Sequence, residues 1–286
     1  MTQNTSETGT LYLCATPIGN LEDMTFRVIK TLKEVDLIAA EDTRNTIKLL
    51  NHFEIKTPMT SYHEYNKIDK AKYLVEKMLN GTNIALVTDA GTPGISDPGE
   101  EIVKQAYQAG ITVTSLPGAC ACITALTLSG LSTRRFSFEA FLPTDKKERK
   151  FILDSLKTET RTTIIYEAPH HLKSTLAELY SYIGNRKITL CRELTKLHET
   201  IQQMTLESAI EYYNTTAPKG EYVMVIEGIS HRQLEEQSIQ EWEKITIQEH
   251  MDIYLTQGGI FESYVIKNEH TMANYIEEAI IANLKG

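Results

Sequence analysis

Short apolar runs alternate with helical patterns over about the first 230 residues. Runs of aliphatic and β-branched residues predict buried strands, and apolar positions repeating every three or four residues predict the helices between them. A helix capped by Asp23 should bury Phe26, Ile29, Leu32 and Val35 on its apolar face. We expect strands at 11–16, 37–42, 84–89 and 111–116, a helix through Leu49 and Leu50, and helices at 69–79 and 100–109. This β-α-β order predicts a mostly parallel sheet with helices on both faces.

The dipeptide Pro117-Gly118 marks a predicted junction to a second α/β unit with mixed strand directions. Its expected strands are 136–141, 162–167, 187–193, about 200–204 and 221–228, and its helices 119–129, 146–157, 170–183 and 206–213. The pattern changes again near residue 230. Residues 231–286 carry four Lys/Arg and ten Asp/Glu, with apolar residues at helical spacing. The sequence therefore predicts an α/β protein with domains at 10–117 and 118–230 and a small, acidic, helical appendage at 231–286.

Length and composition bound the class of protein. At about 150 residues per domain, 286 residues correspond to roughly two domains with a sizeable core. The four cysteines, Cys14, Cys120, Cys122 and Cys191, are too scattered for a secreted disulfide framework. The polar first ten residues do not resemble a signal peptide, and no apolar run approaches the roughly 18 residues that span a bilayer. We therefore expect a cytoplasmic protein without a membrane partner.

Three predicted strands end in sharp turns made of small residues and proline: 15–20 (ATPIGN), 89–99 (DAGTPGISDPG) and 117–121 (PGACA). Ligands of open parallel sheets bind outside the carboxyl ends of the strands, where glycine lets a ligand approach the backbone. The alternative is that each loop is only a tight turn. Because three such loops occur in one half of the chain, we favour a shared ligand site.

The sequence gives little support for dinucleotide-binding, P-loop or metal-binding sites. No loop matches the dinucleotide or P-loop glycine patterns. The Cys120-x-Cys122 pair lacks a second pair, and His170-His171 lacks a helical metal-binding arrangement, so we expect no metal site. The two cysteines are interpreted as small packing residues.

Polar residues also gather where other strands end. Glu41 and Asp42 follow one strand, and His63 lies in a polar segment further along. A structural ion-pair network, with Glu41 or Asp42 as a helix cap, is one interpretation. The other is the polar floor of a cleft, with His63 as a proton acceptor.

Six strings occur in order between about residues 10 and 229, and together they resemble the tetrapyrrole-methylase superfamily. Within it, the chain resembles the rRNA cytidine 2′-O-methyltransferase branch. The strings are LYLCATPIGNLEDMTFRVIKTLKEVDLIAAEDTR, LVTDAGTPGISDPG, LPGACACITAL, YEAPHHL, RELTKLHET and KGEYVMVIEG.

The resemblance implies a homodimer of two-domain α/β chains that bind S-adenosylmethionine in the cleft between their domains. It implies that the methyl group goes to a cytidine ribose of small-subunit rRNA, and the limited basic patch described below favours the assembled subunit as the substrate. The implied cofactor-binding residues are Thr16, Pro17 and Gly19 in the first loop, Asp89, Gly91 and Thr92 in the second, Ala119, Cys120 and Ala121 in the third, and Tyr166 in the second domain.

The chain departs from the family pattern at two places. His171 stands where the family usually has arginine, and the acidic segment 231–286 replaces a small basic terminal domain. We therefore assign RNA binding to neither.

Methyl transfer to a ribose hydroxyl needs a proton acceptor near the reacting oxygen. The candidates are His63, Glu41, Asp42 and Glu167. The segment 134–150 holds six Lys/Arg against three acidic residues, which makes it the expected RNA contact, although a solvated helix start is the alternative.

Two other functions remain open at this point. A tetrapyrrole methyltransferase would share fold and cofactor, but its first loop usually carries a glycine-rich pattern ending in aspartate, unlike ATPIGN. A non-catalytic ribosome-assembly factor would not need three intact cofactor loops.

Overall fold

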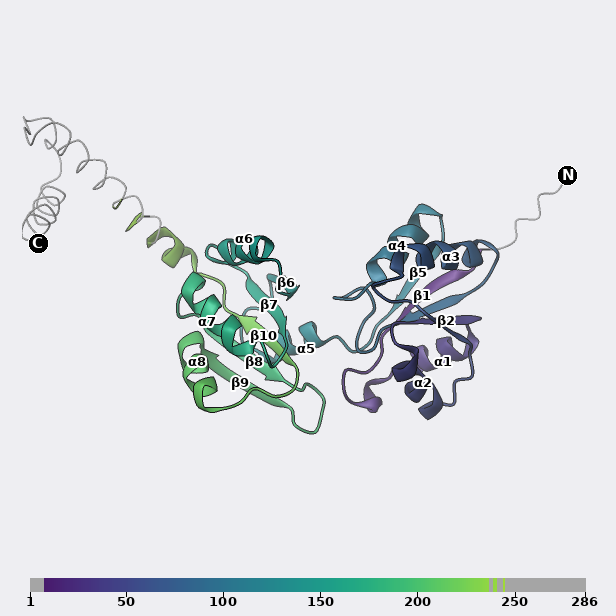
Figure 1. Cartoon of the computed structure of the whole chain (residues 1–286), viewed down its shortest axis with the longest axis horizontal. Helices are drawn as coiled ribbons and strands as arrows, with labels where there is room; N and C mark the ends of the chain where they lie inside the picture. Colours follow the sequence, from purple (N-terminus) through teal and green to yellow (C-terminus); the bar gives the residue numbers. More distant parts are fainter. Residues whose placement is uncertain (1–7, 237–238, 241–243, 245–286) are drawn as a thin grey trace, which may run out of the picture. The chain divides into compact units, whose positions relative to one another are not determined.

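The computed structural model describes residues 8–236, 239–240 and 244 of the 286-residue chain (Figure 1). The chain divides into two compact units, Met1–Gly228 and Ile229–Gly286. All elements named below belong to the first unit.

The first sheet has five strands in the order β3-β2-β4-β1-β5, and every neighbouring pair is parallel. In chain order the strands are β1 (Thr10–Cys14), β2 (Leu37–Ala40), β3 (Met59–Ser61), β4 (Ile84–Val87) and β5 (Thr112–Leu116). The predicted parallel sheet is confirmed. Because all strands run the same way, the loops after β1, β4 and β5 lie at one edge.

Both faces of this sheet are covered by helices. Successive side chains of a strand point to opposite faces, so Leu11 and Leu13 of β1 join one apolar cluster and Cys14 joins the other. Helices α3 (Lys67–Leu79) and α4 (Gly99–Gln108) pack on the first face. Helices α1 (Phe26–Glu34) and α2 (Thr43–His52) pack on the second.

The start of α1 corrects the sequence prediction. Asp23 belongs to a short 3₁₀ turn, Leu21–Asp23, and the cap of α1 is Thr25, whose hydroxyl accepts a hydrogen bond from the Val28 N–H. With the helix beginning at Phe26, the buried stripe passes through Val28 and Leu32, and the Phe26 side chain is 93% exposed. The predicted positions 29, 32 and 35 do pack against the core.

The second sheet has the order β6-β7-β10-β8-β9. The β6–β7 pair is parallel and the other pairs are antiparallel, which confirms the predicted mixed directions. The strands are β6 (Phe136–Phe141), β7 (Thr162–Glu167), β8 (Lys187–Arg192), β9 (Thr200–Thr205) and β10 (Tyr222–Ile226).

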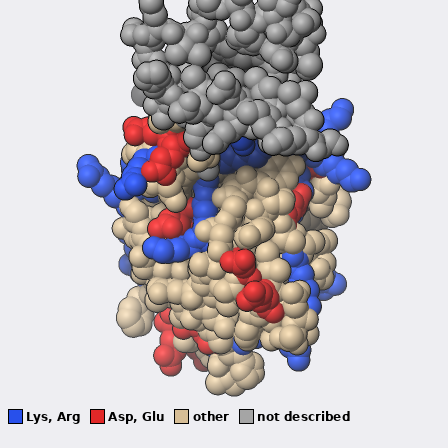
Figure 2. Space-filling model, turned by 90° about the vertical axis from the view of Figure 1, so that its left-hand side faces the viewer, with Lys and Arg blue, Asp and Glu red and all other residues tan. Residues whose placement is uncertain are grey.

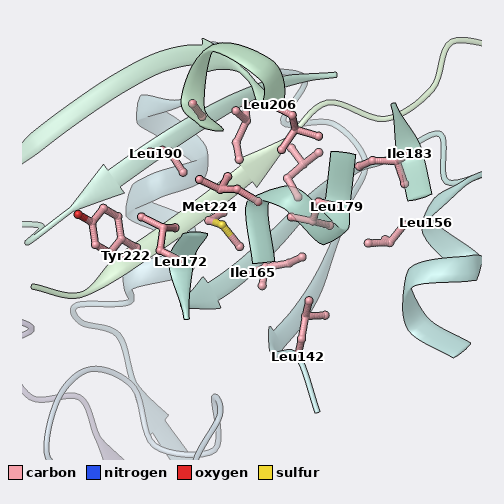
Figure 3. Close-up of a cluster of buried hydrophobic side chains, with 14 of the residues drawn as sticks. Leu142, Leu156, Ile165, Leu172, Leu179, Ile183, Leu190, Leu206, Tyr222 and Met224 are labelled. Atoms are coloured by element: carbon pink, nitrogen blue, oxygen red, sulfur yellow. The ribbon is translucent and has the colours of Figure 1, made fainter. Parts of the chain in front are cut away.

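Successive side chains of these strands again point to opposite faces of the sheet and so form two apolar clusters. Ile165 of β7 and Met224 of β10 point into the larger one (Figure 3), which α6 (Lys146–Leu156), α7 (Leu172–Ile183) and α8 (Leu206–Thr215) cover. Their neighbours in sequence, Ile164 and Val223, face α5 (Ala121–Leu128) on the other side. Helix α5 follows β5 directly and so connects the two sheets.

The predicted domain boundaries at 117/118 and 230/231 stay predictions. The predicted helical appendage at 231–286 falls mostly outside the described residues. In the part of the chain that the structure describes, no helix combines the length and the apolar character needed to cross a membrane.

Candidate functional site

The three loops predicted from the sequence are joined to one another. Backbone hydrogen bonds of 2.9 and 3.0 Å link Thr16 and Gly91 in both directions, and the Thr16 hydroxyl donates to the Thr88 carbonyl at 3.1 Å. The Thr92 hydroxyl donates to the Ala119 carbonyl at 2.9 Å. The loops after β1, β4 and β5 therefore form one connected wall.

Glycine is required at two places in this wall. Gly91 has a φ of 87°, a conformation that favours glycine, and an added Cβ would lie 3.3 Å from Ile18. A Cβ on Gly118 would come within 2.6 Å of the Ala15 side chain. These close approaches explain why small residues gather in all three loops.

A pocket of about 570 Å³ lies against the wall. This volume falls in the range of small-molecule sites, about 300–1,000 Å³. Of the residues predicted from the sequence, the pocket is lined by Glu41, Asp89, Gly91, Thr92, Cys120, Ala121, Tyr166 and Glu167. Six others lie outside its lining: Thr16, Pro17, Gly19, Ala119, Asp42 and His63. Thr16 and Ala119 still support it, through the hydrogen bonds to Gly91 and Thr92.

Two carboxylates stand at the carboxyl ends of β2 and β4. Glu41 Oε2 accepts hydrogen bonds from the Thr88 hydroxyl at 2.6 Å and from the Asp89 N–H at 3.3 Å. Its Oε1 atom has no hydrogen-bond partner among the residues that the structure describes. Asp89 accepts from the Asp42 N–H and from the Asn45 side chain, each at 3.2 Å. Glu41 therefore keeps one oxygen available at the pocket.

Asp42 is engaged outside the pocket. Its carboxylate caps α2 by accepting the Arg44 N–H at 2.8 Å and pairs with the Arg44 guanidinium at 3.0 and 2.6 Å. The hydrogen bonds from Arg44 lower the pKa of Asp42 to about 2. This matches the helix-cap interpretation of the sequence and makes Asp42 a weak proton acceptor.

His63 lies in the loop between β3 and α3. Its Nε2 atom is 3.3 Å from the Asn66 side chain, and its buried Nδ1 atom has no partner among the described residues. The ring contacts Tyr65 edge-on. The structure does not bring His63 to the pocket.

Glu167 ends β7 and is 6% exposed. Both its oxygens accept hydrogen bonds, Oε1 from the Ala168 N–H at 2.8 Å and Oε2 from the Thr175 hydroxyl at 2.6 Å. Arg149 in turn donates to Thr175 at 3.0 Å and to Glu178 at 2.7 Å. Glu167 is therefore held from α6 and α7, which fixes its place in the pocket wall.

Part of the second sheet's contribution to the pocket was not predicted from the sequence. Lys196 lines the pocket, and its Nζ atom pairs with Glu193 at 3.0 Å and with Glu221 at 2.9 Å. Although burial alone would lower it, these hydrogen bonds raise the pKa of Lys196. The available signals were that these residues fall in the strings RELTKLHET and KGEYVMVIEG, and that Glu193 is a polar residue at the end of a predicted strand. Ile18 and Asp97, in the first and second predicted loops, also line the pocket, and Phe141 and Tyr222 line it without having been predicted.

Charge in the pocket is predominantly negative. Among the described lining residues, Lys196 is the single lysine or arginine, whereas the acidic residues are Glu41, Asp89, Asp97, Glu167 and Glu221. Asp97 accepts hydrogen bonds from the backbone N–H groups of Gly94 and Gly99 and so shapes the second loop.

The described residues bring together no group of three or more side chains suited to a metal ion. Backbone loops, apolar side chains and carboxylates fit a compact organic cation of nucleoside size.

The sequence profile described as "Tetrapyrrole (Corrin/Porphyrin) Methylases" matches residues 10–210. The chain is 48% identical over 256 residues to the Ribosomal RNA small subunit methyltransferase I of Halalkalibacterium halodurans, covering 90% of this chain and 88% of that protein. It is 55% identical over 221 residues to the same-named protein of a Synechocystis species, covering 77% and 79%. The chain belongs to the ribosomal RNA small subunit methyltransferase I branch of the tetrapyrrole methylase family.

Solved structures of tetrapyrrole methylases share the fold. Uroporphyrin-III-C-methyltransferase from Thermus thermophilus superimposes with a TM-score of 0.54 at 17% identity, covering 76% of this chain and 94% of its own. The methyltransferase CobJ gives 0.59 at 18%, covering 77% and 95%. At these identities the likeness shows the fold alone. One structure of the Thermus thermophilus enzyme is a complex with S-adenyl homocysteine.

Proposed function

We propose that this chain transfers a methyl group from S-adenosylmethionine to the 2′-hydroxyl of a cytidine in small-subunit ribosomal RNA. The observation that carries the proposal is its identity of about one half to methyltransferases of that name over most of its length. The connected loops after β1, β4 and β5 and the pocket beside them supply a site for the cofactor. The excess of carboxylates suits a ligand that carries a positive charge.

The chain's own residues would hold this ligand from two sides. The first side is the wall formed by Asp89, Gly91 and Thr92 with Cys120 and Ala121. The second is the end of β7, where Tyr166 lines the pocket and its hydroxyl accepts a hydrogen bond from the Cys122 N–H at 3.1 Å. When bound, S-adenosylmethionine supplies an electrophilic methyl group on a sulfonium centre.

We further propose that Glu41 accepts the proton of the ribose hydroxyl. The oxygen must be held about 3–3.5 Å from the carbon that it attacks, and it reacts faster as its proton is withdrawn. Of the four candidates, Glu41 alone both lines the pocket and keeps an oxygen free of partners among the described residues. Glu167 lines the pocket with both oxygens occupied, and Asp42 and His63 lie outside the lining.

Methyl transfer to isolated small subunits tests the proposal against the two rival functions. With labelled S-adenosylmethionine, we expect label in small subunits that lack the modification and none in large subunits or uroporphyrinogen. Label in uroporphyrinogen would favour a tetrapyrrole methyltransferase. Binding to small subunits without any transfer would favour an assembly factor.

The RNA contact that we propose is the start of α6. Lys146, Lys147 and Lys150 are exposed there, whereas Arg149 is bound to Glu178 and Thr175 and is therefore not available to phosphate. On the face drawn in Figure 2, basic and acidic side chains are interspersed among uncharged ones. A patch of three lysines suits an enzyme that recognises a folded ribosomal particle by its shape rather than naked RNA by its charge.

Reversing the three lysines to glutamate tests this contact. We expect lower activity on small subunits, with a salt dependence whose log–log slope is shallower by about 0.7–0.9 per lost phosphate contact. Affinity for S-adenosylmethionine should not change. The helix should tolerate the change at Lys146 and Lys147 because acidic residues are favourable in a first turn, and Lys150 is exposed. A matched control reverses three exposed lysines of α1 and α2, namely Lys30, Lys33 and Lys48. Equal losses in both triple variants would place the RNA elsewhere.

The oligomeric state, the form of the substrate and the cellular compartment are proposals as well. We propose that the chain acts as a homodimer on the assembled small subunit in the cytoplasm. Its four cysteines are free thiols, as a reducing compartment favours.

A further inference from the structure

Two thiols meet at the wall of the pocket. The Sγ atoms of Cys120 and Cys122 are 3.4 Å apart. Cys120 is partly exposed and lines the pocket, whereas Cys122 is 4% exposed and packs beneath it against the second sheet. The sequence suggested that both are small packing residues. In the structure both pack in or against the apolar cluster around α5, and Cys120 lines the pocket as well.

The two thiols have opposite acid–base character. Cys120 is the N-cap residue of α5. The hydrogen bond from the Cys122 thiol lowers the pKa of Cys120; burial opposes this, and the Ile123 N–H and the Thr92 hydroxyl add to the lowering. The same thiol–thiol hydrogen bond, together with burial, raises the pKa of Cys122. The pairing thus favours ionisation of Cys120 and disfavours ionisation of Cys122.

The backbone permits a bond between them. Two steps along a chain span at most about 7 Å, and disulfides join Cα atoms about 4.4–6.8 Å apart. The sulfurs would close from 3.4 Å to about 2.05 Å. Redox-sensing cysteines commonly combine a low pKa, access to solvent and a nearby second thiol.

We propose that Cys120 and Cys122 form a peroxide-sensitive modification site, in which a disulfide closes within the pocket wall and weakens binding of the cofactor. The modification itself stands on the thiol geometry. Its effect on the cofactor rests on the proposed function, which assigns this pocket to S-adenosylmethionine.

The oxidation proceeds in two balanced steps. The Cys120 thiolate attacks one oxygen of hydrogen peroxide, the O–O bond breaks, and the departing hydroxide takes up a proton to leave as water. Cys120 is then a sulfenic acid. The Cys122 sulfur attacks the Cys120 sulfur, the S–O bond breaks, and a second water leaves with the Cys122 proton. Two thiols are oxidised to one disulfide and one peroxide is reduced to two waters.

The disulfide would change the pocket because Cys120 belongs to its wall. Closing the bond should draw the Cys120 sulfur toward Cys122 in α5. The adjoining Ala119 carbonyl accepts from Thr92, so we expect the third loop to shift as well. We expect affinity for S-adenosylmethionine to fall about tenfold, which is the order of the loss expected when one hydrogen bond to a ligand is removed.

The test treats the reduced full-length chain with increasing hydrogen peroxide, blocks the remaining thiols with a maleimide and maps the peptides by mass spectrometry. We expect loss of two hydrogens within the peptide that holds Cys120 and Cys122, reversed by dithiothreitol. The internal controls are Cys14 and Cys191, both buried. Burial raises the pKa of Cys14 to about 12 and that of Cys191 to about 11, so both should stay unmodified under native conditions.

Two variants and one binding measurement complete the test. C122S should stop at the sulfenic acid, trapped by dimedone, and C120S should not react. Calorimetry should show weaker S-adenosylmethionine binding by the oxidised chain, restored on reduction. Reaction of Cys14 or Cys191 as fast as Cys120 would overturn the modification site, and unchanged affinity after complete oxidation would overturn its effect. A reduced chain that never binds S-adenosylmethionine would instead refute the proposed function and leave the mass-spectrometric result standing.

Discussion

Replacing Asp89 with alanine will weaken binding of S-adenosylmethionine by about 10- to 150-fold, which is the range expected for losing hydrogen bonds to a charged group. The Asp89 carboxylate lines the pocket and accepts hydrogen bonds from the Asp42 N–H and the Asn45 side chain. Its removal takes a negative charge from the wall and releases two donors where β2 and β4 end. Isothermal calorimetry on the full-length chain measures the change.

The matched control lies at the opposite ends of the same two strands. The Asp36 carboxylate accepts the Asn83 N–H at 2.8 Å, just before β2 and β4 begin. Asp36→Ala therefore removes a comparable link between the strands, far along them from the pocket. We expect it to lower thermal stability while leaving S-adenosylmethionine affinity within about twofold. Equal affinity in the two variants would show that Asp89 acts only through the fold.

The second large effect is expected at Glu41. Glu41→Gln should lower kcat by about 10²- to 10⁴-fold, the usual contribution of a positioned general base. The amide keeps an oxygen that accepts from Thr88 and Asp89, so cofactor affinity should stay within about threefold. Single-turnover transfer of labelled methyl groups to small subunits separates the chemical step from binding.

Glu167→Gln provides the comparison for this prediction. Both oxygens of Glu167 already accept hydrogen bonds, from Ala168 and Thr175, so its loss should affect the pocket wall more than the proton transfer. We expect a smaller fall in kcat than for Glu41→Gln. If Glu167→Gln is the variant that stops the chemical step, Glu167 is the proton acceptor and the assignment to Glu41 is wrong.

Local sequence patterns were sufficient for most of the fold because the central strands are buried on both faces. Ile84 to Val87 are all apolar, as a central parallel strand requires, and the residues alternate between the two helical layers. The start of α1 was misplaced because Asp23 and Thr25 are both good caps. Which of them begins the helix depends on whether Val28 or Phe26 reaches the core, and that is decided by packing.

The three loops of the site were predictable because parallel strands bring their carboxyl ends to one edge. The partners of individual side chains were not. Arg149 looks like its lysine neighbours in sequence, yet contacts from α7 hold it within the fold. Lys196 comes to the pocket by pairing with Glu221, which is 25 residues away. Contacts between residues that are far apart in the sequence leave no hydrophobic periodicity in either segment. Such contacts could therefore not be predicted from the sequence pattern.

The position at which the methyl group arrives tests the central claim most directly. Small subunits from a strain that lacks this enzyme are incubated with the chain and labelled S-adenosylmethionine, and their rRNA is then hydrolysed in alkali. A methylated 2′-oxygen cannot attack the neighbouring phosphate, so the label is expected in an alkali-resistant dinucleotide with cytidine on its 5′ side. Label in a mononucleotide, which would indicate methylation of a base, or no label in small-subunit rRNA would contradict the account.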